Sequence, residues 1–335
     1  MKWRTLVFSP LVAVMKDQVD GLRRKQIKAA QISSIQTDQE NRAAIQAWLR
    51  GDLSLLYVAP ERLRNEEFMK AMRSVSPDMV VMDECFTPDV EVLTARGFVR
   101  FDALREDDLC GQFHTADETV TFVKPTEIIC RDHDGPMVKL QAKKTCDLDV
   151  TEAHELLLKS AKGWRKEPAR HASLNHLKRL ASCGEAGYTG GRKDLSPFER
   201  LMVAFQADGS THRVCRDGTT TALFAFCKAR KIKRFLQLMS DGGFEFNEVK
   251  DRPGRRRFIV RGLAAASRTL RDHFCLAEMN VSRAQALLRE AVEWDGHKHS
   301  KTSLYYSSVI QDNADFLQAA CVLAGWKSNR IIQTD

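Results

Sequence analysis

The stretch VVMDECFTPDVEVLTARGFVRF, residues 80 to 101, joins two different structural patterns. Its first part is a short apolar run that ends on two acids, which is typical of a buried parallel strand that carries carboxylates at its C-terminal end. An α/β protein would continue into a helix at this point. The chain continues instead through Cys85 into a stretch where apolar and polar residues alternate, and this period of two predicts β-structure. The fold class therefore changes within a few residues.

Length and composition predict a multidomain globular chain. The 335 residues are 43% hydrophobic and 29% charged, and this length accommodates two or three domains. Apolar runs stay below the ~20 residues that span a bilayer, and the N-terminus lacks the apolar segment of an export signal. We therefore expect a cytoplasmic, monomeric protein without a membrane partner. The nine cysteines show no CxxC spacing, which favours reduced thiols over disulfides or zinc.

The net charge of +8 is concentrated in two basic runs, KARKIKR at 228–234 and RPGRRRF at 252–258. Such runs are either solvated surface or contacts to a polyanion. A polyanion is therefore a candidate partner. The candidate phosphate contacts are Lys228, Arg230, Lys231, Lys233, Arg234, Arg255, Arg256 and Arg257.

Residues 1–84 carry an α/β pattern. Strands are expected at 5–8, 53–59 and 78–84, and helices follow the first two, the first from Leu11 to about Leu22. Alternating strands and helices predict a parallel sheet. The stretches SPLVAVMKDQV, YVAPERL and VVMDE resemble, in order and spacing, motifs of RecQ-type DNA helicases. The resemblance covers residues 3–84 and implies a RecA-like sheet, with Asp83 orienting the magnesium of bound ATP and Glu84 positioning the attacking water.

The nucleotide chemistry of that family is expected only in an intact helicase host. A phosphate loop of the form G-x-x-x-x-G-K-[ST] does not occur in the 335 residues, and its backbone amides and lysine form the phosphate cradle. We therefore expect ATP as a cofactor of the host alone and no ATPase activity from this chain.

The segment from Cys85 resembles inteins, the self-splicing elements built on a Hint domain. CFTPDVEVLTARGFVRFDAL, 85–104, is similar to their first motif, and DVTEAHELLL, with Thr151 and His154, is similar to their second. The resemblance implies a mostly-β horseshoe and an N–S acyl shift at the scissile Glu84–Cys85 bond. Cys85 would be the nucleophile, His154 the acid that activates the amide, and Thr151 a polar support. A thiol suits this role because it is a strong nucleophile at neutral pH.

Two later helices each end on an Asp-Gly pair. LMVAFQADG ends at Asp208-Gly209, and AQALLREAVEWDGHK contains Asp295-Gly296 about 87 residues on. Both resemble the LAGLIDADG (DOD-type) motif of homing endonucleases, although Gln206 replaces an acid of the motif. The resemblance implies α+β repeats of the form αββαββα, with Asp208 and Asp295 as catalytic acids that bind Mg²⁺. It also implies double-stranded DNA as the partner. We expect Gly209 and Gly296 to be left-handed and Lys231 or Lys233 to supply an active-site lysine.

The combined interpretation is a host interrupted by an insert. It assigns 1–84 to a RecQ-like fragment, 85–190 to the N-terminal half of a Hint domain, and 191–335 to an endonuclease with repeats at about 195–280 and 283–335. We expect the chain to begin inside the host and to stop within the second repeat, before the C-terminal splice junction. Two alternatives stay open, namely a DNA-binding module that does not cleave, and a helicase fragment with a passive insert.

Overall fold

The chain folds into two compact units, each built from two separate stretches of sequence. Unit 1 contains residues 1–90 and 126–180, and unit 2 contains 91–125 and 181–335. The structure, a computed structural model, describes residues 4–9, 12–59, 62, 63, 65–82, 86–125, 128, 133, 135–142, 146–172, 180–214, 219–264, 266–300 and 303–331. Within this part of the chain, no helix is both long enough and apolar enough to cross a membrane.

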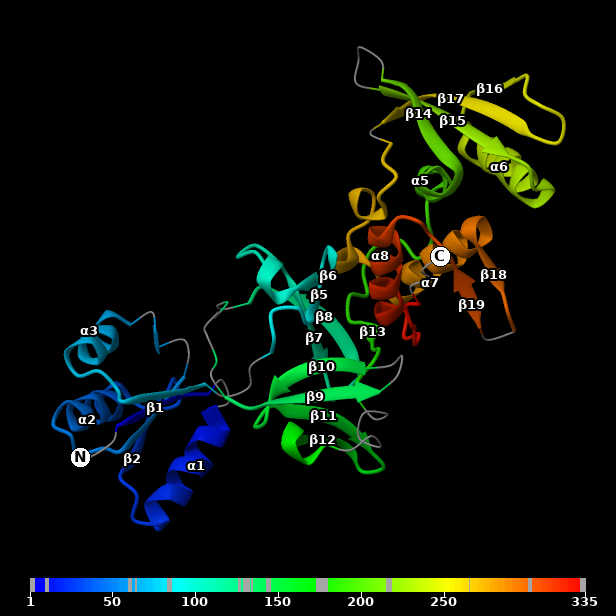
Figure 1. The fold of residues 1–335 in the computed structure, drawn as a ribbon. Helices are drawn as coiled ribbons and strands as arrows, with labels where there is room; N and C mark the ends of the chain where they lie inside the picture. Colours follow the sequence, from blue (N-terminus) through cyan, green and yellow to red (C-terminus); the bar gives the residue numbers. More distant parts are fainter. Residues whose placement is uncertain are drawn as a thin grey trace. The chain divides into compact units, whose positions relative to one another are not determined.

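A four-stranded sheet with the order β2-β3-β1-β4 opens unit 1, and each neighbouring pair in it is parallel (Figure 1). Its strands are β1 (Thr5–Phe8), β2 (Ala29–Ile32), β3 (Leu55–Val58) and β4 (Met79–Met82), and the connecting helices are α1 (Val12–Arg24), α2 (Asp38–Leu49) and α3 (Glu66–Ser74). The parallel strands predicted near 5–8, 53–59 and 78–84 are thus confirmed. The prediction missed β2 and α2, although Thr37 and Glu40 form a capping box that marks the start of α2.

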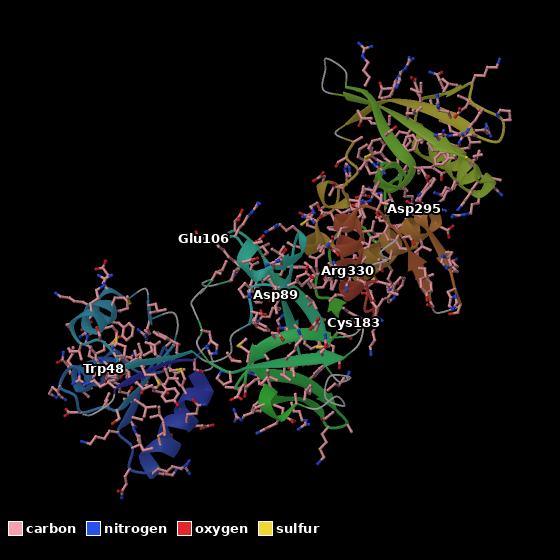
Figure 2. The ribbon with its side chains drawn as sticks, in the orientation of Figure 1. Trp48, Asp89, Glu106, Cys183, Asp295 and Arg330 are labelled. Carbon is pink, nitrogen blue, oxygen red and sulfur yellow. The ribbon has the colours of Figure 1, made fainter. Side chains whose placement is uncertain are left out.

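One apolar cluster holds α2 and α3 against this sheet. Trp48 of α2 is fully buried (Figure 2), and its indole nitrogen donates a hydrogen bond to the Val75 carbonyl at 3.2 Å, just beyond α3. Met15 and Val19 of α1 are also buried but lie outside this cluster. Side chains alternate between the two faces of a strand. With α2 and α3 in one cluster and buried residues of α1 outside it, both faces of the sheet are covered, as expected for parallel strands.

Two antiparallel hairpins form the remainder of unit 1. The first pairs β9 (Met137–Ala142) with β10 (Cys146–Thr151), and the second pairs β11 (Glu155–Ser160) with β12 (Gly163–Pro168). Leu140, Val150, Leu156, Leu158 and Ala169 make a small core of their own. Phe86 forms an isolated antiparallel bridge with Val150. The chain directly after the Asp83–Cys85 junction is therefore fixed to β10.

Unit 2 begins with a five-stranded sheet of order β13-β8-β7-β5-β6. Its strands are β5 (Glu91–Thr94), β6 (Gly97–Arg100), β7 (Cys110–His114), β8 (Thr119–Val123) and β13 (Glu185–Ala186). β5 and β6 form the hairpin predicted after Cys85. The turn of this hairpin is tied down by an ion pair from Arg96 to the buried Asp108, with Nε 2.6 Å from Oδ1.

From residue 197 the elements of unit 2 follow in the order α-β-β-α-β-β and then α-β-β-α (Figure 1). They are α5 (Pro197–Asp208), β14 (Gly209–Val214), β15 (Thr219–Phe226), α6 (Ala229–Gly242), β16 (Phe246–Val249), β17 (Arg256–Ala264), α7 (Val281–Asp295), β18 (Gly296–Lys298), β19 (Leu304–Tyr306) and α8 (Gln311–Leu323). Strands β14 to β17 form an antiparallel sheet of order β14-β15-β17-β16, and β18 pairs with β19. The two Asp-Gly sequences thus stand at equivalent helix-to-strand junctions.

The core of unit 2 is rich in aromatic side chains that join these elements. Phe235 of α6 lies 5.0 Å from Phe224 and 4.8 Å from Phe258, measured between ring centroids. Trp294 of α7 packs on Phe226 at 5.8 Å. Aromatic pairs at such distances add to the stability gained from burial alone. Side chains of α5, α6 and α7 consequently share one hydrophobic core.

Candidate functional site

Two buried helices bring Asp208 and Asp295 to the same place. Asp208 is the last residue of α5 and Asp295 the last of α7, and these helices pack against each other. Ala204 and Ala291 are fully buried, and such small side chains permit the close approach of two helices. Ser196 starts α5 with a capping box to Glu199, and α5 ends at Asp208. The capping box therefore fixes the residue at which the acid-bearing helix begins.

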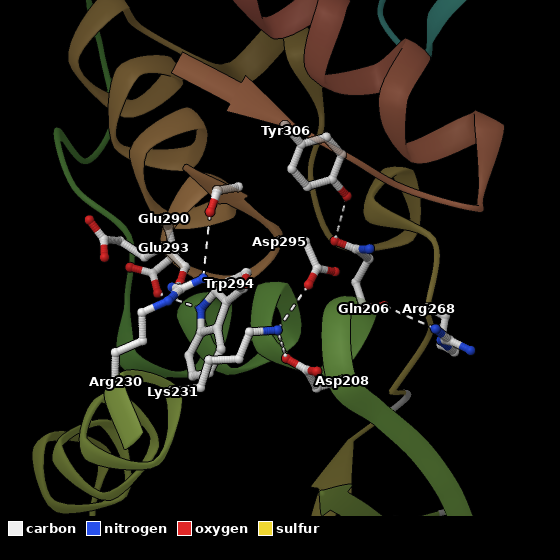
Figure 3. Close-up of polar contacts among 11 residues, drawn as sticks. Gln206, Asp208, Arg230, Lys231, Arg268, Glu290, Glu293, Trp294, Asp295 and Tyr306 are labelled. Carbon is white, nitrogen blue, oxygen red and sulfur yellow. Dashed lines mark hydrogen bonds and ion pairs between the residues drawn. The ribbon is translucent and has the colours of Figure 1, made fainter. Parts of the chain in front are cut away.

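The two carboxylates share one ammonium group, that of Lys231. Its Nζ lies 2.5 Å from Oδ2 of Asp208 and 2.9 Å from Oδ1 of Asp295 (Figure 3). Lys231 is only 7% exposed, and it belongs to the first turn of α6. A lysine charge is rarely buried unless it is paired. Of the two candidates for an active-site lysine, the structure brings Lys231 to the acids, whereas Lys233 is exposed.

Burial makes Asp208 harder to charge. It raises the pKa of Asp208 above its ordinary value, and the negative charge of Asp295 acts in the same direction, while Lys231 opposes both. Desolvation and a nearby like charge both favour the neutral form of an acid. The ammonium of Lys231 therefore offsets part of the effect of burial and favours the ionised form of Asp208.

The glycines after the two acids are not left-handed, contrary to prediction. Gly209 has φ −92° and Gly296 has φ −135°, values that any residue adopts. Glycine is needed here because of crowding. A Cβ on Gly209 would lie 2.7 Å from the Cα of Phe205, and one on Gly296 would lie 2.3 Å from the carbonyl oxygen of Tyr305. At Gly209 the preceding turn of α5 leaves no room for a side chain, and at Gly296 the backbone of strand β19 leaves none.

Gln206, which stands where the motif has an acid, is paired with a tyrosine. Gln206 is 2% exposed, and its Oε1 accepts a hydrogen bond from the Tyr306 hydroxyl at 3.0 Å (Figure 3). Burial raises the pKa of Tyr306 to about 12, so the phenol keeps its proton near neutral pH. A neutral donor and a neutral acceptor thus lie beside the acid pair, on β19 and α5.

The eight basic residues predicted to contact phosphate have different environments. Lys231 bridges the acids, Arg230 donates to backbone carbonyls at the end of α7, and Arg234 pairs with the buried Glu290 at 2.5 Å. On β17 and the turn before it, Arg256 pairs with Glu248, and Arg255 and Arg257 with Asp251. Lys228 and Lys233 are exposed at the start of α6. The exposed charge on this surface is therefore smaller than the sequence predicts.

A second candidate site lies in unit 1 around His154. The backbone N–H of His154 donates to the carbonyl oxygen of Thr151 at 3.1 Å, and Thr151 is buried. The ring of Phe86 packs edge-on against the His154 imidazole with 4.3 Å between centroids, and Thr87 N–H donates to Asp149 O at 3.2 Å. Asp83, Glu84 and Cys85 lie outside the described residues. The residue next to Cys85 therefore contacts the predicted catalytic histidine.

Sequence reasoning missed Tyr306, which carries no local signal, and did not predict that Lys231, within a basic run, would be buried. Arg268, whose guanidinium Nη2 lies 3.4 Å from the Gln206 carbonyl, was missed for the same reason. Both reach the end of α5 from segments at least 60 residues away in the sequence. An alignment of the two Asp-Gly repeats places Gln206 opposite Glu293. Such an alignment would have indicated that residues near these two positions belong to the site.

Comparison with known proteins finds two groups of relatives. A search against family models finds no match. Over 80 residues, or 24% of the chain, it is 40% identical to the ATP-dependent DNA helicase RecQ of Bacillus subtilis, and it is 35% identical over 85 residues to the ATP-dependent helicase SGS1 of Saccharomyces cerevisiae. In an alignment 284 positions long, which covers 73% of the chain, it is 29% identical to the ribonucleoside-diphosphate reductase subunit beta of Aquifex aeolicus.

These matches show that about a quarter of the chain is homologous to RecQ-like helicases. The matched length agrees with the segment 3–84 that resembles this family. The chain spans 40% of the reductase subunit, 14% of the Bacillus helicase and 6% of the yeast helicase.

Proposed function

We propose that the chain carries a self-splicing intein with a DNA homing endonuclease of the LAGLIDADG type, inserted into the acidic motif of a RecQ-like helicase. The observation on which this rests is the acid pair. Asp208 and Asp295 end two packed helices, share the ammonium of Lys231, and are each followed by a glycine that opens a β-hairpin. Two carboxylates at equivalent positions of two repeated units are what cleavage of two DNA strands requires.

The donor set of this site fits a divalent cation. A cationic nitrogen already lies within hydrogen-bond distance of both carboxylates, and hard oxygen ligands suit Mg²⁺. Asp208 and Asp295 would hold the ion. Within the described residues, no group of three or more His, Cys, Asp or Glu side chains could hold a metal, so water and DNA phosphate would complete the shell. A bound Mg²⁺ would lower the pKa of water and neutralise phosphodiester charge.

The chain's own residues would prepare the site for DNA. Lys231 would offset one of the two negative charges of the acids, and it can turn its ammonium toward a phosphate oxygen because three rotatable donors sit on a flexible stem. Gln206, fixed by Tyr306, would orient a water molecule through its amide group. Two exposed lysines near Lys231, namely Lys228 at the N-cap of α6 and Lys233 within α6, would contact the DNA backbone.

For splicing, the acyl group of Glu84 would move from the amide nitrogen of Cys85 to its sulfur. The thiol loses its proton, the C–N bond breaks, and the nitrogen gains a proton, for which His154 is suited. The contact of Phe86 with the His154 ring supports this assignment, because it places the junction next to the imidazole. The buried Thr151 lies one turn of chain before His154 and would hold the scissile peptide.

The pattern of relatives supports an insert. A segment shared with a reductase subunit covers 73% of the chain, whereas the helicase matches cover 24%. These shares fit side by side within one chain. If a mobile segment is inserted into a host, the two parts of the chain should be similar to proteins of unrelated function. A single helicase domain would be similar to helicases along its whole length.

Cleavage of DNA tests the endonuclease. The purified chain would be incubated with Mg²⁺ and a duplex that codes for the uninterrupted helicase motif around Asp83-Glu84. We expect a double-strand break at one position, and we expect Asp208→Asn or Asp295→Asn to remove it while leaving binding of the duplex unchanged. Absence of cleavage at all Mg²⁺ concentrations, in a chain that is folded, would contradict the proposal.

Scission at the junction tests the intein. Incubation with a thiol should release a fragment that ends at Glu84, because a thioester at Cys85 exchanges with thiols. Cys85→Ala should prevent this release, and His154→Ala should slow it. Release that persists in Cys85→Ala would show that the thiol assignment is wrong.

One observation favours a second candidate, a DNA-binding module that does not cleave. Lys231 occupies the position between the acids, and the neutral Gln206 replaces an acid of the motif. In this case the duplex would be bound without being nicked, and Mg²⁺ would not change its affinity. Titration of the duplex with the chain, with and without Mg²⁺, therefore distinguishes the two functions, because it measures both binding and nicking.

A further inference from the structure

The two acids stand at the least favourable end of their helices. The last carbonyl groups of an α-helix have no partners within the helix and carry a partial negative charge. Asp208 and Asp295 are the final residues of α5 and α7, so two carboxylates and two such helix ends converge on one point. The ammonium of Lys231 contacts both carboxylates, and its single charge offsets only part of this negative charge.

Arg230 covers the end of α7. Its guanidinium Nη1 donates to the carbonyl oxygen of Glu293, and Nη2 lies 3.4 Å from the carbonyl oxygen of Trp294 and 3.5 Å from that of Gly296 (Figure 3). These three carbonyls surround Asp295 in the sequence. A planar guanidinium with five donors is suited to contact several oxygens at once. Arg230 therefore holds the backbone on both sides of the acid.

Arg268 occupies the equivalent position at the end of α5. Its Nη2 lies 3.4 Å from the carbonyl oxygen of Gln206, two residues before Asp208, just as Glu293 stands two residues before Asp295. The segment that carries Arg268 is fixed by the fully buried Asn313 of α8. The Asn313 amide donates to the Arg268 carbonyl at 2.8 Å and accepts from Leu270 N–H at 2.9 Å. Each acid-bearing helix thus has its own arginine.

We propose that Arg230 and Arg268 are matched positioning residues that cap the two helix ends and so hold the Asp208 and Asp295 carboxylates where a divalent cation binds them. The inference rests on the proposed function, since it assigns a role to residues around its metal site. It also explains why Arg230, an exposed residue of a basic run, contacts the carbonyl groups at the end of α7. The arginines act through the helix backbone and not on the substrate.

The test is the affinity of the intact chain for Mg²⁺ alone, measured by titration calorimetry at one pH. We expect Arg230→Gln and Arg268→Gln each to weaken Mg²⁺ binding about tenfold, as estimated for loss of a charge at a helix end. Arg230→Lys, which keeps the charge but not the fork of donors, should recover part of the loss. The matched control is Arg289→Gln, which removes an exposed arginine of α7 that contacts Gln285 and not the helix end.

Each result has a single meaning. Wild-type affinity in both glutamine variants, or an equal loss in Arg289→Gln, would overturn the inference while leaving the proposed function intact. If the wild-type chain binds no Mg²⁺, the proposed metal site is wrong and the inference is refuted with it. Should Arg230→Gln unfold, the exposed Arg268 and the lysine variant supply the same comparison in folded protein, as judged by circular dichroism.

Discussion

Replacing Lys231 by methionine removes the ammonium between the acids but keeps an apolar stem. Because Nζ lies 2.5 Å and 2.9 Å from the two carboxylate oxygens, these oxygens are at most 5.4 Å apart. Two unit charges at that separation repel each other by about 3 kcal/mol at an effective dielectric constant of ~20. Loss of one partner of a buried ion pair costs about 3–5 kcal/mol. We therefore expect Lys231→Met to lower the free energy of unfolding of unit 2 by about 3 kcal/mol at pH 7.5.

A double-mutant cycle measures this repulsion. Unfolding in urea, followed by tryptophan fluorescence, would be compared for Lys231→Met, Asp208→Asn and the double variant. Asp208→Asn removes one of the repelling charges, so the double variant should be more stable than Lys231→Met by about 2–3 kcal/mol. Lys233→Met is the matched control, because it removes an exposed lysine of the same helix and should change stability by less than about 0.5 kcal/mol.

The same carboxyl group sets a dependence on pH. Burial raises the pKa of Asp208 above 3.8, so the folded state binds this proton more tightly than the unfolded chain. Stability is therefore lost as the pH rises from about 3.8 through the folded-state pKa of Asp208. Lys231→Met should extend this loss to higher pH. A loss of less than about 1 kcal/mol in Lys231→Met, or one that Asp208→Asn does not reduce, would refute the bridging role of the ammonium.

Three further changes test the surroundings of the acids. Tyr306→Phe removes the hydroxyl that donates to the buried Gln206 oxygen and should lower the free energy of unfolding by about 1–3 kcal/mol. Because the pKa of Tyr306 is raised to about 12, the wild type loses stability between pH 10 and pH 12. The difference in unfolding free energy between the wild type and Tyr306→Phe should therefore shrink over that interval. Gly296→Ala places a Cβ 2.3 Å from the Tyr305 carbonyl oxygen and should cost about 2 kcal/mol or more in urea unfolding, and a neutral result would contradict the crowding argument. Ser196→Ala should lower the thermal midpoint through a loss of about 1 kcal/mol of capping energy, and Ser196→Asp should restore it.

The sequence predicted what depends on neighbours along the chain. The ends of α5 and α7 at Asp208 and Asp295 follow from helical periodicity and an Asp-Gly exit, and the parallel strands of residues 5–82 follow from short apolar runs between helices. These features are local, so a single segment carries the information. The capping box at Thr37 was equally local, and the helix that it starts could have been predicted from the same rule.

Features set by distant parts of the chain were beyond such rules. The left-handed glycines were expected from helix-end propensity, but at Gly296 the tertiary approach of the Tyr305 backbone decides the residue type. The basic run 228–234 was predicted to face DNA from its charge alone, whereas its environment depends on helix α7, more than 50 residues later. A dense run of charges indicates a surface segment. Only the tertiary packing shows which of its basic residues are buried.

The bridge between Phe86 and Val150 imposes an order of events during synthesis. The two residues are 64 positions apart, and Phe86 also contacts the His154 ring. At roughly 5–20 residues per second, a ribosome needs about 3–13 s after Phe86 before these contacts have their partners. If the proposed acyl shift after Glu84 depends on His154, it cannot begin before the β9–β10 hairpin and the histidine have been synthesised.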